Sequence, residues 1–482
     1  MPAAVSSAPA VEEIRLGIPP DELFDALRDR PGAFFLDSAQ RAGGLGAWSF
    51  IGFDPFLEFR AKGRRLALNH GGETEAREGD PLEELGALLA KARGPAARGI
   101  PFAGGAVGCL SYELCAQLDR IRRTKPDDEE IPEAAFGFYD GLLAFDHGAG
   151  RAFVVANPAG GRDADSVGQG VERAAREALG RGRRQGGDER RLAPSRDQAR
   201  ARPPRPEPRC NFTEEEYRAA VRRIKDYIAA GDVYQVNLTK RFEAPLSGHP
   251  YDLYRRLRRR SPAPFAGYLN LGSMQVLSSS PERFLRVQGR RAETRPIKGT
   301  RPRGKTVEED DRLRRDLLAS EKDRAELLMI VDLERNDLGR VCEFGSVRVE
   351  ELHRLESHPT VHHLVATASG LLRPGSGVID CIRAMFPGGS ITGAPKIRAM
   401  QIIDEVEPCR RHFYTGSIGY LGFDGNCDLN VAIRTIFCRE GRAWFNVGGG
   451  IVWDSDPDAE YQECLDKGQA MLEALRGEDR KT

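Results

Sequence analysis

The sequence predicts an α+β protein, because capped helical stretches and tightly turned strand pairs occur in the same chain of 482 residues. The helix that follows Thr213 opens with a capping-box sequence, and the helix that follows Asp456-Pro457 has proline in its first turn. Two pairs of apolar strands are separated by the short turns Gly272-Ser273 and Gln288-Gly289. These two hairpins are the local evidence for antiparallel pairing.

The composition is that of an ordinary globular chain, with 40% hydrophobic and 30% charged residues. The 72 basic residues balance the 72 acidic ones, so anion binding must come from local charge and not from a global field. There is no signal-peptide pattern and no apolar run of membrane-spanning length, so a cytoplasmic location is expected. Nine cysteines without a Cys-x-x-Cys pair argue against a disulfide framework and a structural zinc site.

Residues 1–179 are predicted to form an N-terminal region in which helices and strands alternate. We expect a helix over 20–28 and strands over 33–36, 48–53 and 56–59. A second helix is capped by Asp80 and presents a stripe of leucines on one face. The glycine-rich run 104–112 lacks the Gly-Lys-Ser/Thr of a phosphate loop, which favours a tightly packed strand.

Residues 180–208 are predicted to be a linker, because arginine, glycine and proline replace the apolar residues that burial would need. The arginines leave nucleic-acid binding open as an alternative. No aromatic residues that would stack on bases are interleaved with them, so we expect no nucleic-acid partner.

Residues 209–482 are predicted to be the catalytic region. Its first helix buries Tyr217, Val221, Ile224 and Ile228, and the next segment, 234–242, alternates as a half-buried strand with one polar face. The register of the second hairpin brings Glu282 opposite Arg295 or Pro296, and therefore close to Lys298.

Lys298 is the candidate nucleophile. It lies between a strand-like run and a Pro/Gly-rich loop, and Arg295, Arg301 and Arg303 surround it in sequence. Neighbouring positive charge and burial both lower the pKa of a lysine, which makes its amine nucleophilic near neutral pH. The alternative is a solvated turn.

Two helical stretches carry acidic pairs with the same spacing, Asp323 with Glu326 and Glu460 with Glu463. Residues three apart share a helix face, and Lys467 lies on the same side as Glu463. If the two faces converge, they offer oxygen ligands suited to Mg²⁺. Otherwise they are two solvated faces.

Four segments beside strands, at 386–396, 414–420, 430–434 and 447–450, are predicted to be turns, and the glycine-rich ones among them expose backbone N–H groups to an approaching anion. Arg434 would add a bidentate grip on a carboxylate. Taken singly, each turn is equally compatible with a purely structural role.

Together these segments resemble the chorismate-utilising enzymes from about Phe212 to the last helix, and the earlier region resembles the N-terminal part of their aminating members. The matching segments, in the family's order, are Gly231-Asp-Val-Tyr-Gln-Val-Asn237, Ser280-Pro-Glu-Arg-Phe284, Pro296-Ile-Lys-Gly-Thr300, Val331-Asp-Leu-Glu-Arg-Asn-Asp337, Ile391-Thr-Gly-Ala-Pro-Lys396 and Asn430-Val-Ala-Ile-Arg434. Pro-Ile-Lys-Gly-Thr, Gly389-Ser-Ile-Thr392 and Gly416-Ser-Ile-Gly419 resemble the aminodeoxychorismate branch, whereas the anthranilate branch has alanine in place of this lysine.

The resemblance implies two large antiparallel β-sheets packed as a sandwich with helices outside; the hairpins agree with this fold but do not show it. It also implies that Lys298 is the nucleophile, Glu282 the general acid, and Glu326 and Glu463 the ligands of Mg²⁺. The residues implied to bind substrate are Gly299, Thr300, His363, Thr392, Tyr414, Arg434, Gly448, Gly449, Gly450 and Lys467.

The implied reaction converts chorismate and ammonia to 4-amino-4-deoxychorismate, the precursor of p-aminobenzoate and folate. The chain lacks the Gly-x-Cys-x-Gly elbow of a glutaminase, since Gly108-Cys-Leu-Ser111 has no glycine after it. A separate glutamine amidotransferase subunit, forming a heterodimer, is therefore implied as the source of ammonia.

The resemblance leaves several alternatives. Ser38, Pro264, Phe265 and Ala266 match positions of an amino-acid regulatory pocket in the anthranilate relatives. An anthranilate synthase with an unusual lysine is the closest rival function. An isochorismate- or salicylate-forming enzyme and a non-catalytic chorismate-binding paralogue have less support from these residues.

Overall fold

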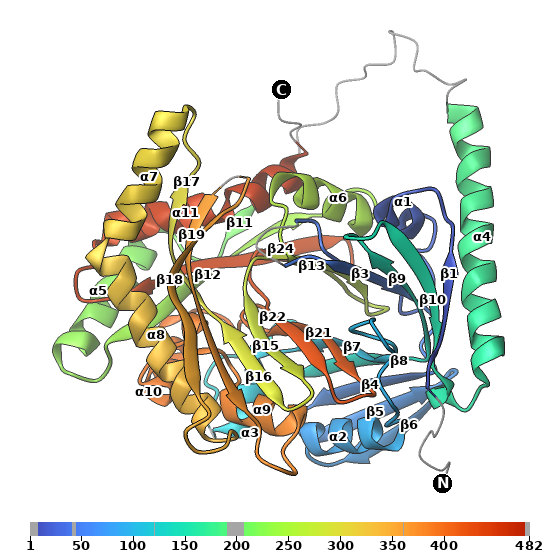
Figure 1. Cartoon of the computed structure of the whole chain (residues 1–482). Coiled ribbons are helices and arrows are strands. Elements are labelled where there is room, and N and C mark those ends of the chain that lie inside the picture. The colour runs from blue at the N-terminus through green and yellow to red at the C-terminus, as the bar shows by residue number, and fades with distance from the viewer. Residues whose placement is uncertain (1–7, 41–44, 120, 190–206, 360, 478–482) are drawn as a thin grey trace.

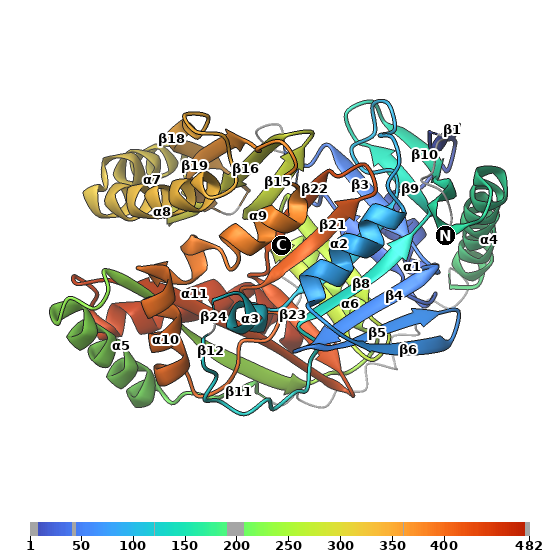
Figure 2. The same cartoon turned by 90° about the horizontal axis from the view of Figure 1, so that it is seen from below.

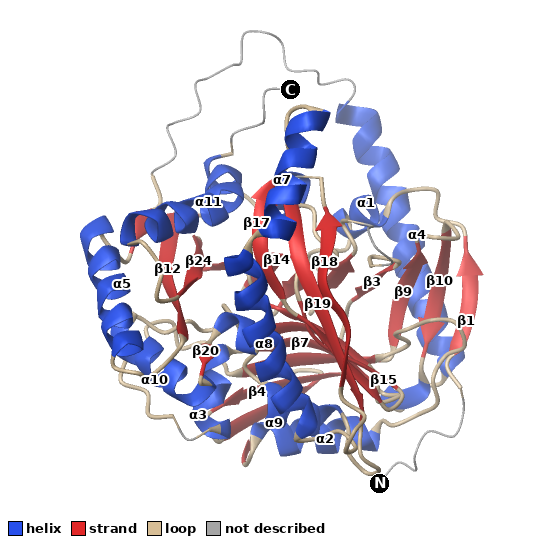
Figure 3. Ribbon diagram, turned by 60° about the vertical axis from the view of Figure 1, so that its left-hand side comes forward, coloured by secondary structure: helices blue, strands red, loops and turns tan. Residues whose placement is uncertain are grey.

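Two antiparallel β-sheets of 12 strands each form the body of the protein and face one another, with helices around them (Figure 1). The computed structural model describes residues 8–40, 45–119, 121–189, 207–359 and 361–477. This confirms the predicted α+β sandwich. Figure 3 shows the strands inside and the helices on the outside of the molecule.

We call the two sheets the upper and the lower sheet, as they appear in Figure 1. The upper sheet contains, in spatial order, β1 (Ala10–Ile14), β10 (Arg151–Ala156), β9 (Gly141–Asp146), β3 (Trp48–Gly52), β2 (Phe34–Asp37), β13 (Phe265–Asn270), β14 (Gln275–Ser280), β23 (Thr435–Arg439), β24 (Arg442–Ile451), β12 (Gln235–Pro245) and β11 (Arg209–Cys210), with β20 (Gly393–Ala394) paired to β12.

The lower sheet contains, in spatial order, β17 (Ile297–Pro302), β19 (Val361–Leu371), β16 (Arg291–Arg295), β15 (Arg283–Gln288), β22 (Cys427–Val431), β21 (Ser417–Gly422), β7 (Gly105–Leu110), β8 (Ala134–Tyr139), β4 (Leu57–Lys62), β5 (Arg65–His70) and β6 (Glu73–Glu78), with β18 (Arg348–Ser357) paired to β19.

The helices are α1 (Pro20–Asp25), α2 (Pro81–Lys91), α3 (Cys115–Leu118), α4 (Ala164–Glu189), α5 (Glu214–Ala229), α6 (Pro250–Arg260), α7 (Val307–Ala319), α8 (Glu321–Gly339), α9 (Val378–Met385), α10 (Lys396–Val406) and α11 (Pro457–Arg476). Helices α5, α6 and α11 cover the upper sheet, while α2 and α9 lie across the lower sheet (Figure 2). Helices α7 and α8 pack against β17 and β19 at one end of the lower sheet.

Each sheet contains strands from both the N-terminal and the catalytic region. In the upper sheet β2 pairs with β13, and in the lower sheet β7 pairs with β21. The predicted linker begins inside helix α4, which continues to Glu189, and its residues 190–206 lie outside the described part of the chain. The two regions are therefore joined by shared sheets as well as by the chain between them.

Local sequence signals account for several elements. The capping box at Thr213 is present, because its hydroxyl accepts from the Glu216 amide while the Glu216 carboxylate accepts from the Thr213 amide. Asp80 and Asp456 cap α2 and α11 as predicted. Both predicted hairpins form, β13–β14 and β15–β16.

The alternation over 234–242 correctly predicted a strand, β12, but not its surroundings. The polar side chains on this strand are buried as well as the apolar ones, because Glu407 accepts from Thr239 and the Ser390 carbonyl accepts from Asn237. Tyr234 is the first residue of the predicted segment, and the alternation placed it on the buried face. It lies just before the strand and is exposed. β12 is therefore covered on both faces.

The core between the sheets is rich in aromatic side chains. Phe34 of the upper sheet meets Tyr139 of the lower sheet edge-on at 4.7 Å between ring centroids. Trp444 of β24 belongs to the same cluster and is only 1% exposed. Such interlayer contacts account for the close packing of the two sheets. Within the described residues, no helix is both long enough and apolar enough to cross a membrane.

We expect Trp444→Ala to lower the free energy of unfolding by about 3–5 kcal/mol, because it removes a large side chain from between the sheets. Trp453→Ala is the matched control, since Trp453 is 60% exposed and should change stability by less than about 0.5 kcal/mol. Urea denaturation followed by circular dichroism measures both. Equal effects of the two substitutions would contradict this assignment of the core.

Candidate active site

Lys298 lies on β17, at the end of the lower sheet, opposite Leu364 of β19. Its residue is half-buried, and its amine lies within the electrostatic reach of Glu326, Lys467, Glu282 and Glu463. Burial lowers the pKa of Lys298 and the positive charge of Lys467 lowers it further, whereas the three carboxylates oppose the shift. The net direction is downward, as the activation of an amine requires.

The sequence prediction was wrong about which charges lower this pKa. Each neighbouring arginine forms an ion pair of its own: Arg295 with Glu356, Arg301 with Asp316 and Asp323, and Arg303 with Asp310. A paired guanidinium has little net field at a distance. Burial and Lys467 therefore account for the lowered pKa of Lys298.

Glu282 lies directly before β15, and the pairing of Arg283 with Arg295 places it opposite Pro296, as the hairpin register predicted. The side chain is buried, and the Ser390 hydroxyl donates to its Oε1 at 2.5 Å. Burial raises the pKa of Glu282 to about 7, against the opposing effects of Ser390, Lys298 and the Ile297 amide. A carboxyl group with this pKa is partly protonated near neutral pH and can donate a proton.

The two acidic helices converge on Lys298, but only one carboxylate of each acidic pair acts on it. Glu326 of α8 and Glu463 of α11 both act on the lysine electrostatically and repel each other. Asp323 instead pairs with Arg301 at 3.0 Å. Glu460 accepts from the Ser455 hydroxyl at 2.7 Å. The shared spacing thus identified both helices, and the local hydrogen bonds decide which acid of each pair faces the lysine.

The donor set of Glu326 and Glu463 fits a hard divalent cation. In the part of the chain that the structure describes, no three His, Cys, Asp or Glu side chains are gathered closely enough to hold a metal by themselves. Mg²⁺ commonly takes one or two protein carboxylates and fills its other positions with water or substrate oxygens. A cation would also relieve the repulsion that, with burial, raises the pKa of Glu326.

Lys467 joins the glycine strand β24 to helix α11. Its Nζ is 2.6 Å from Glu463 Oε1 and donates to the Gly448 carbonyl at 3.3 Å. A Cβ added to Gly449 would lie 3.2 Å from Glu460 Oε2 and 3.6 Å from Lys467 Nζ. At Gly450 it would lie 2.5 Å from Gln235 Nε2. The glycines of β24 therefore leave room beside the acidic helix.

Gly299 and Thr300 follow Lys298 on the same strand. Gly299 has a φ of +79°, and a Cβ there would lie 2.9 Å from both Asp323 and Leu317. Glycine is therefore required both by the backbone conformation and by the approach of the helices. The Thr300 hydroxyl is hydrogen-bonded to His363 Nδ1 at 2.9 Å.

Arg434 lies near His363 and acts on it electrostatically. Arg434 is cationic, whereas His363 is neutral. Burial lowers the pKa of Arg434, and no carboxylate within the described ranges forms an ion pair with its guanidinium. Burial and Arg434 hold the pKa of His363 well below its ordinary value, so the imidazole is neutral at pH 7. A buried, unpaired guanidinium favours the binding of an anion.

Two predicted substrate-binding residues are deeply buried. The Thr392 hydroxyl donates to the Gly388 carbonyl at 2.9 Å, and the residue is inaccessible to solvent. Tyr414 is also buried, and burial raises the pKa of its phenol. In this structure Thr392 stabilises the 388–392 turn, and Tyr414 lies near Arg411 and Cys464.

The four residues of the predicted regulatory pocket meet in one cavity of about 90 Å³. Ser38, Pro264, Phe265 and Ala266 line it together with Trp48 and other residues of both sheets. The Ser38 hydroxyl donates to the Trp48 carbonyl at 2.5 Å. The structure thus brings the four residues together, and a regulatory role and a ligand for this cavity stay predictions.

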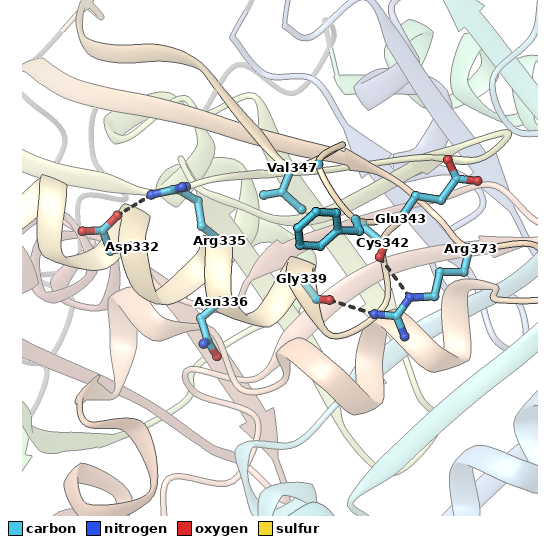
Figure 4. A pocket seen from close by; sticks show the side chains of 10 residues that line it. Asp332, Arg335, Asn336, Gly339, Cys342, Glu343, Val347 and Arg373 are labelled. Atoms are coloured by element: carbon cyan, nitrogen blue, oxygen red, sulfur yellow. Dashed lines mark hydrogen bonds and ion pairs between the residues drawn. The ribbon is translucent and has the colours of Figure 1, made fainter.

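A larger surface hollow of about 490 Å³ lies at the C-terminal end of α8 and contains none of the predicted site residues (Figure 4). Arg335 pairs with Asp332 at 2.8 Å, and Arg373 donates to the backbone carbonyls of Gly339 and Cys342. Its arginines are already occupied. The hollow is therefore a poorer candidate for an anionic substrate than the cluster around Lys298.

Sequence reasoning missed Ser390, the hydrogen-bond donor to Glu282. Ser390 stands in the Gly389-Ser-Ile-Thr392 segment, for which the sequence analysis named only Thr392 as a site residue. It also gave no role to Glu334 and Lys396, both of which lie inside matched motifs. Nothing in the spacing of Ser390 and Glu334 shows that they are close to Glu282.

The chain is similar to known proteins over most of its length. The family model described as chorismate binding enzyme matches residues 33–473. The chain is 39% identical to aminodeoxychorismate synthase component 1 of Bacillus subtilis over 91% of each chain, and 42% identical to anthranilate synthase component 1 of Thermus thermophilus over 92% of each. The crystal structure of anthranilate synthase component I from Streptococcus pneumoniae superposes with a TM-score of 0.74 at 31% identity, covering 89% of this chain and 92% of that one.

The family match spans nearly the whole chain, and the relatives share both sequence and fold with it over comparable lengths. The predicted two-sheet architecture and the gathered lysine and carboxylates agree with that match. The chain therefore belongs to the chorismate binding enzymes and is a chorismate-utilising enzyme.

Proposed function

We propose that the chain is the chorismate-aminating component of an aminodeoxychorismate synthase, which forms 4-amino-4-deoxychorismate from chorismate and ammonia. The observation that carries this proposal is the amine of Lys298, whose pKa is lowered by burial and which is grouped with Glu282, Glu326 and Glu463. Relatives bearing the aminodeoxychorismate and the anthranilate name are about equally similar to the chain, so the proposal depends on the residues of the site.

The positive side chains suit a substrate with two carboxylates. Arg434 offers a half-buried guanidinium for one of them, and Lys467 adds a second cation beside the glycines of β24. Glu326 and Glu463 would hold Mg²⁺, which supplies positive charge to offset a substrate carboxylate. These interactions would orient the ring toward Lys298.

Lys298 and Glu282 divide the first chemical step. The neutral amine of Lys298 forms a bond from Nζ to C2 of chorismate, the ring π electrons shift, and the C4–oxygen bond breaks. Glu282 gives its proton to the departing hydroxyl, which leaves as water, and the secondary ammonium on Lys298 then releases a proton. Positioned proton transfer of this kind contributes about 10²–10⁴ in rate.

Ammonia completes the reaction by attacking C4. The π electrons shift back, the bond between C2 and Lys298 breaks, and the departing nitrogen takes up a proton, so that the neutral lysine amine is released for another cycle. The new ammonium at C4 loses one proton, so the overall change replaces a hydroxyl by an amine and releases water. With no amine at position 298, C2 would be open to ammonia itself, which leads to the anthranilate outcome.

A separate glutamine amidotransferase is the proposed source of ammonia. Several relatives are named as component 1, which implies a second component in their systems. The chain itself has no Gly-x-Cys-x-Gly elbow. We therefore expect a separate amidotransferase subunit, bound to this chain as a heterodimer, to supply ammonia to the cluster around Lys298.

Lys298→Ala should abolish formation of 4-amino-4-deoxychorismate, with a loss of about 100-fold or more in kcat, because the covalent step is removed. The assay supplies chorismate, Mg²⁺ and an ammonium salt, and the products are separated by chromatography. Lys305→Ala is the control, since Lys305 is an exposed lysine of the same segment. Unchanged conversion to the same product would show that the amine has no chemical part.

The wild-type assay also separates the proposed function from its closest rival. Anthranilate is fluorescent, whereas 4-amino-4-deoxychorismate needs a lyase to become p-aminobenzoate. A wild-type chain that accumulates anthranilate would be an anthranilate synthase.

The pH profile of kcat should fall on its basic side around pH 7. Glu282 must be protonated to act, and its pKa is raised to about 7, so the active form is lost as the pH rises through that value. Glu282→Gln should reduce kcat by about 10²–10⁴ and remove this basic limb. Retention of the same limb in Glu282→Gln would mean that another group controls it.

The purified chain should use ammonium salts but not glutamine. Release of glutamate is followed by a coupled dehydrogenase assay, with and without an added amidotransferase subunit. Glutamate formation by the chain alone would exclude the two-component arrangement.

A further inference from the structure

One short turn lies between two buried carboxyl groups. The 3-10 helix Gly389–Ile391 follows α9, and its Ser390 hydroxyl donates to Glu282 Oε1 at 2.5 Å. The preceding residue, Gly389, donates its backbone N–H to Glu334 Oε1 at 2.8 Å. Consecutive residues of one turn thus contact Glu282 on one side and Glu334 of α8 on the other.

Glu334 has no visible structural reason to be a carboxylic acid. It is 2% exposed, and its Oε2 has no hydrogen-bond partner among the described residues. A buried polar oxygen without a partner costs free energy, so its presence calls for an explanation. The nearby cation, Lys396, donates to Asp337 Oδ2 at 2.5 Å and to the Met385 carbonyl at 2.8 Å, and in the described part of the chain it forms no hydrogen bond or ion pair with Glu334.

The helix and the turn approach each other too closely for a side chain at position 389. A Cβ there would lie 2.6 Å from Leu333 Cδ2 and 3.2 Å from Glu334 Oε1. Glycine therefore allows the direct hydrogen bond between the turn and the Glu334 carboxyl. A second hydrogen bond fixes the same turn to β12, since the Ser390 carbonyl accepts from Asn237 Nδ2 at 2.8 Å.

We propose that Glu334 is a positioning residue for the proton-donating carboxyl: it holds the Gly389–Ser390 turn in the place where the Ser390 hydroxyl donates to Glu282. This inference rests on the proposed function of Glu282. Glu334 touches neither the reacting atoms nor Lys298 in this arrangement. It acts through Ser390.

Glu334 and Glu282 are also near enough for their charges to interact. Burial raises the pKa of Glu334 to about 7, and the charges of Asp337 and Glu282 raise it while Lys396 and the Gly389 amide oppose them. Electrostatic coupling between two groups is reciprocal, so an ionised Glu334 favours the protonated form of Glu282. The other groups that face Glu282 are Lys298, the Ser390 hydroxyl and the Ile297 amide.

Two substitutions of Glu334 separate its hydrogen bond from its charge. Glu334→Gln keeps an oxygen that can accept from Gly389 but removes the charge, so kcat should stay within about threefold while the basic limb of its pH profile moves to lower pH. Glu334→Leu removes the acceptor as well, so kcat should fall by about tenfold or more with little change in the KM for chorismate.

Asp332→Leu is the matched control, because Asp332 is an exposed acid on the same helix. It should leave kcat and the pH profile unchanged. Circular dichroism and thermal melting of each variant show whether it folds. If Glu334→Leu does not fold, Glu334→Ala makes the same test with a smaller side chain, since it also removes the acceptor of the Gly389 hydrogen bond.

A Glu334→Leu variant that folds and retains wild-type kcat would overturn the positioning role, and an unchanged basic limb in Glu334→Gln would overturn the effect of charge. These results are distinct from a failure of the proposed function. If wild-type protein forms anthranilate instead of 4-amino-4-deoxychorismate, the proposed function fails, but the same variants still test Glu334, because loss of the C4 hydroxyl also needs a proton in that reaction.

Discussion

The site depends on placing one lysine amine beside carboxylates in surroundings that disfavour its charge. Desolvation lowers the pKa of Lys298, while Glu326, Glu282 and Glu463 partly restore its affinity for a proton. A fully exposed lysine would be protonated and inert at neutral pH. The balance between burial and neighbouring charge therefore decides whether the amine can act as a nucleophile.

The two-sheet fold produces this balance by bringing distant segments to one place. β17 carries Lys298 at the end of the lower sheet, whereas β24 and α11 bring the glycine strand and Glu463 from the upper sheet. Helix α8 packs against β17 and β19 and supplies Glu326 (Figure 1). The site is assembled where elements of both sheets meet, so the packing of the sheets positions its charges.

The sequence predicted the elements whose signals are local. Caps at Asp80, Thr213 and Asp456 and the two hairpins formed as expected, and the hairpin register placed Glu282 correctly. The two acidic helices were identified by spacing, and the family resemblance supplied the architecture. These features depend on residues that lie close together in the chain, or on a pattern shared by many related chains.

The features that sequence did not predict depend on long-range contacts. The arginines beside Lys298 are neutralised by acids such as Glu356 and Asp316, which spacing alone does not pair with them. Asp323 forms an ion pair with Arg301, so of the pair Asp323 and Glu326 only Glu326 acts on the charge of Lys298. Ser390 contacts Glu282, which is 108 residues away in sequence, and Gly389 contacts Glu334, which is 55 residues away.

The most direct test of this account is to look for the covalent bond itself. Wild-type protein is mixed with chorismate and Mg²⁺ without ammonia, quenched rapidly in acid, digested and analysed by mass spectrometry. The account predicts that the peptide containing Lys298 gains the mass of chorismate less one water, with the modification on Lys298. The absence of any adduct, or an adduct on another residue such as Lys305, would contradict it.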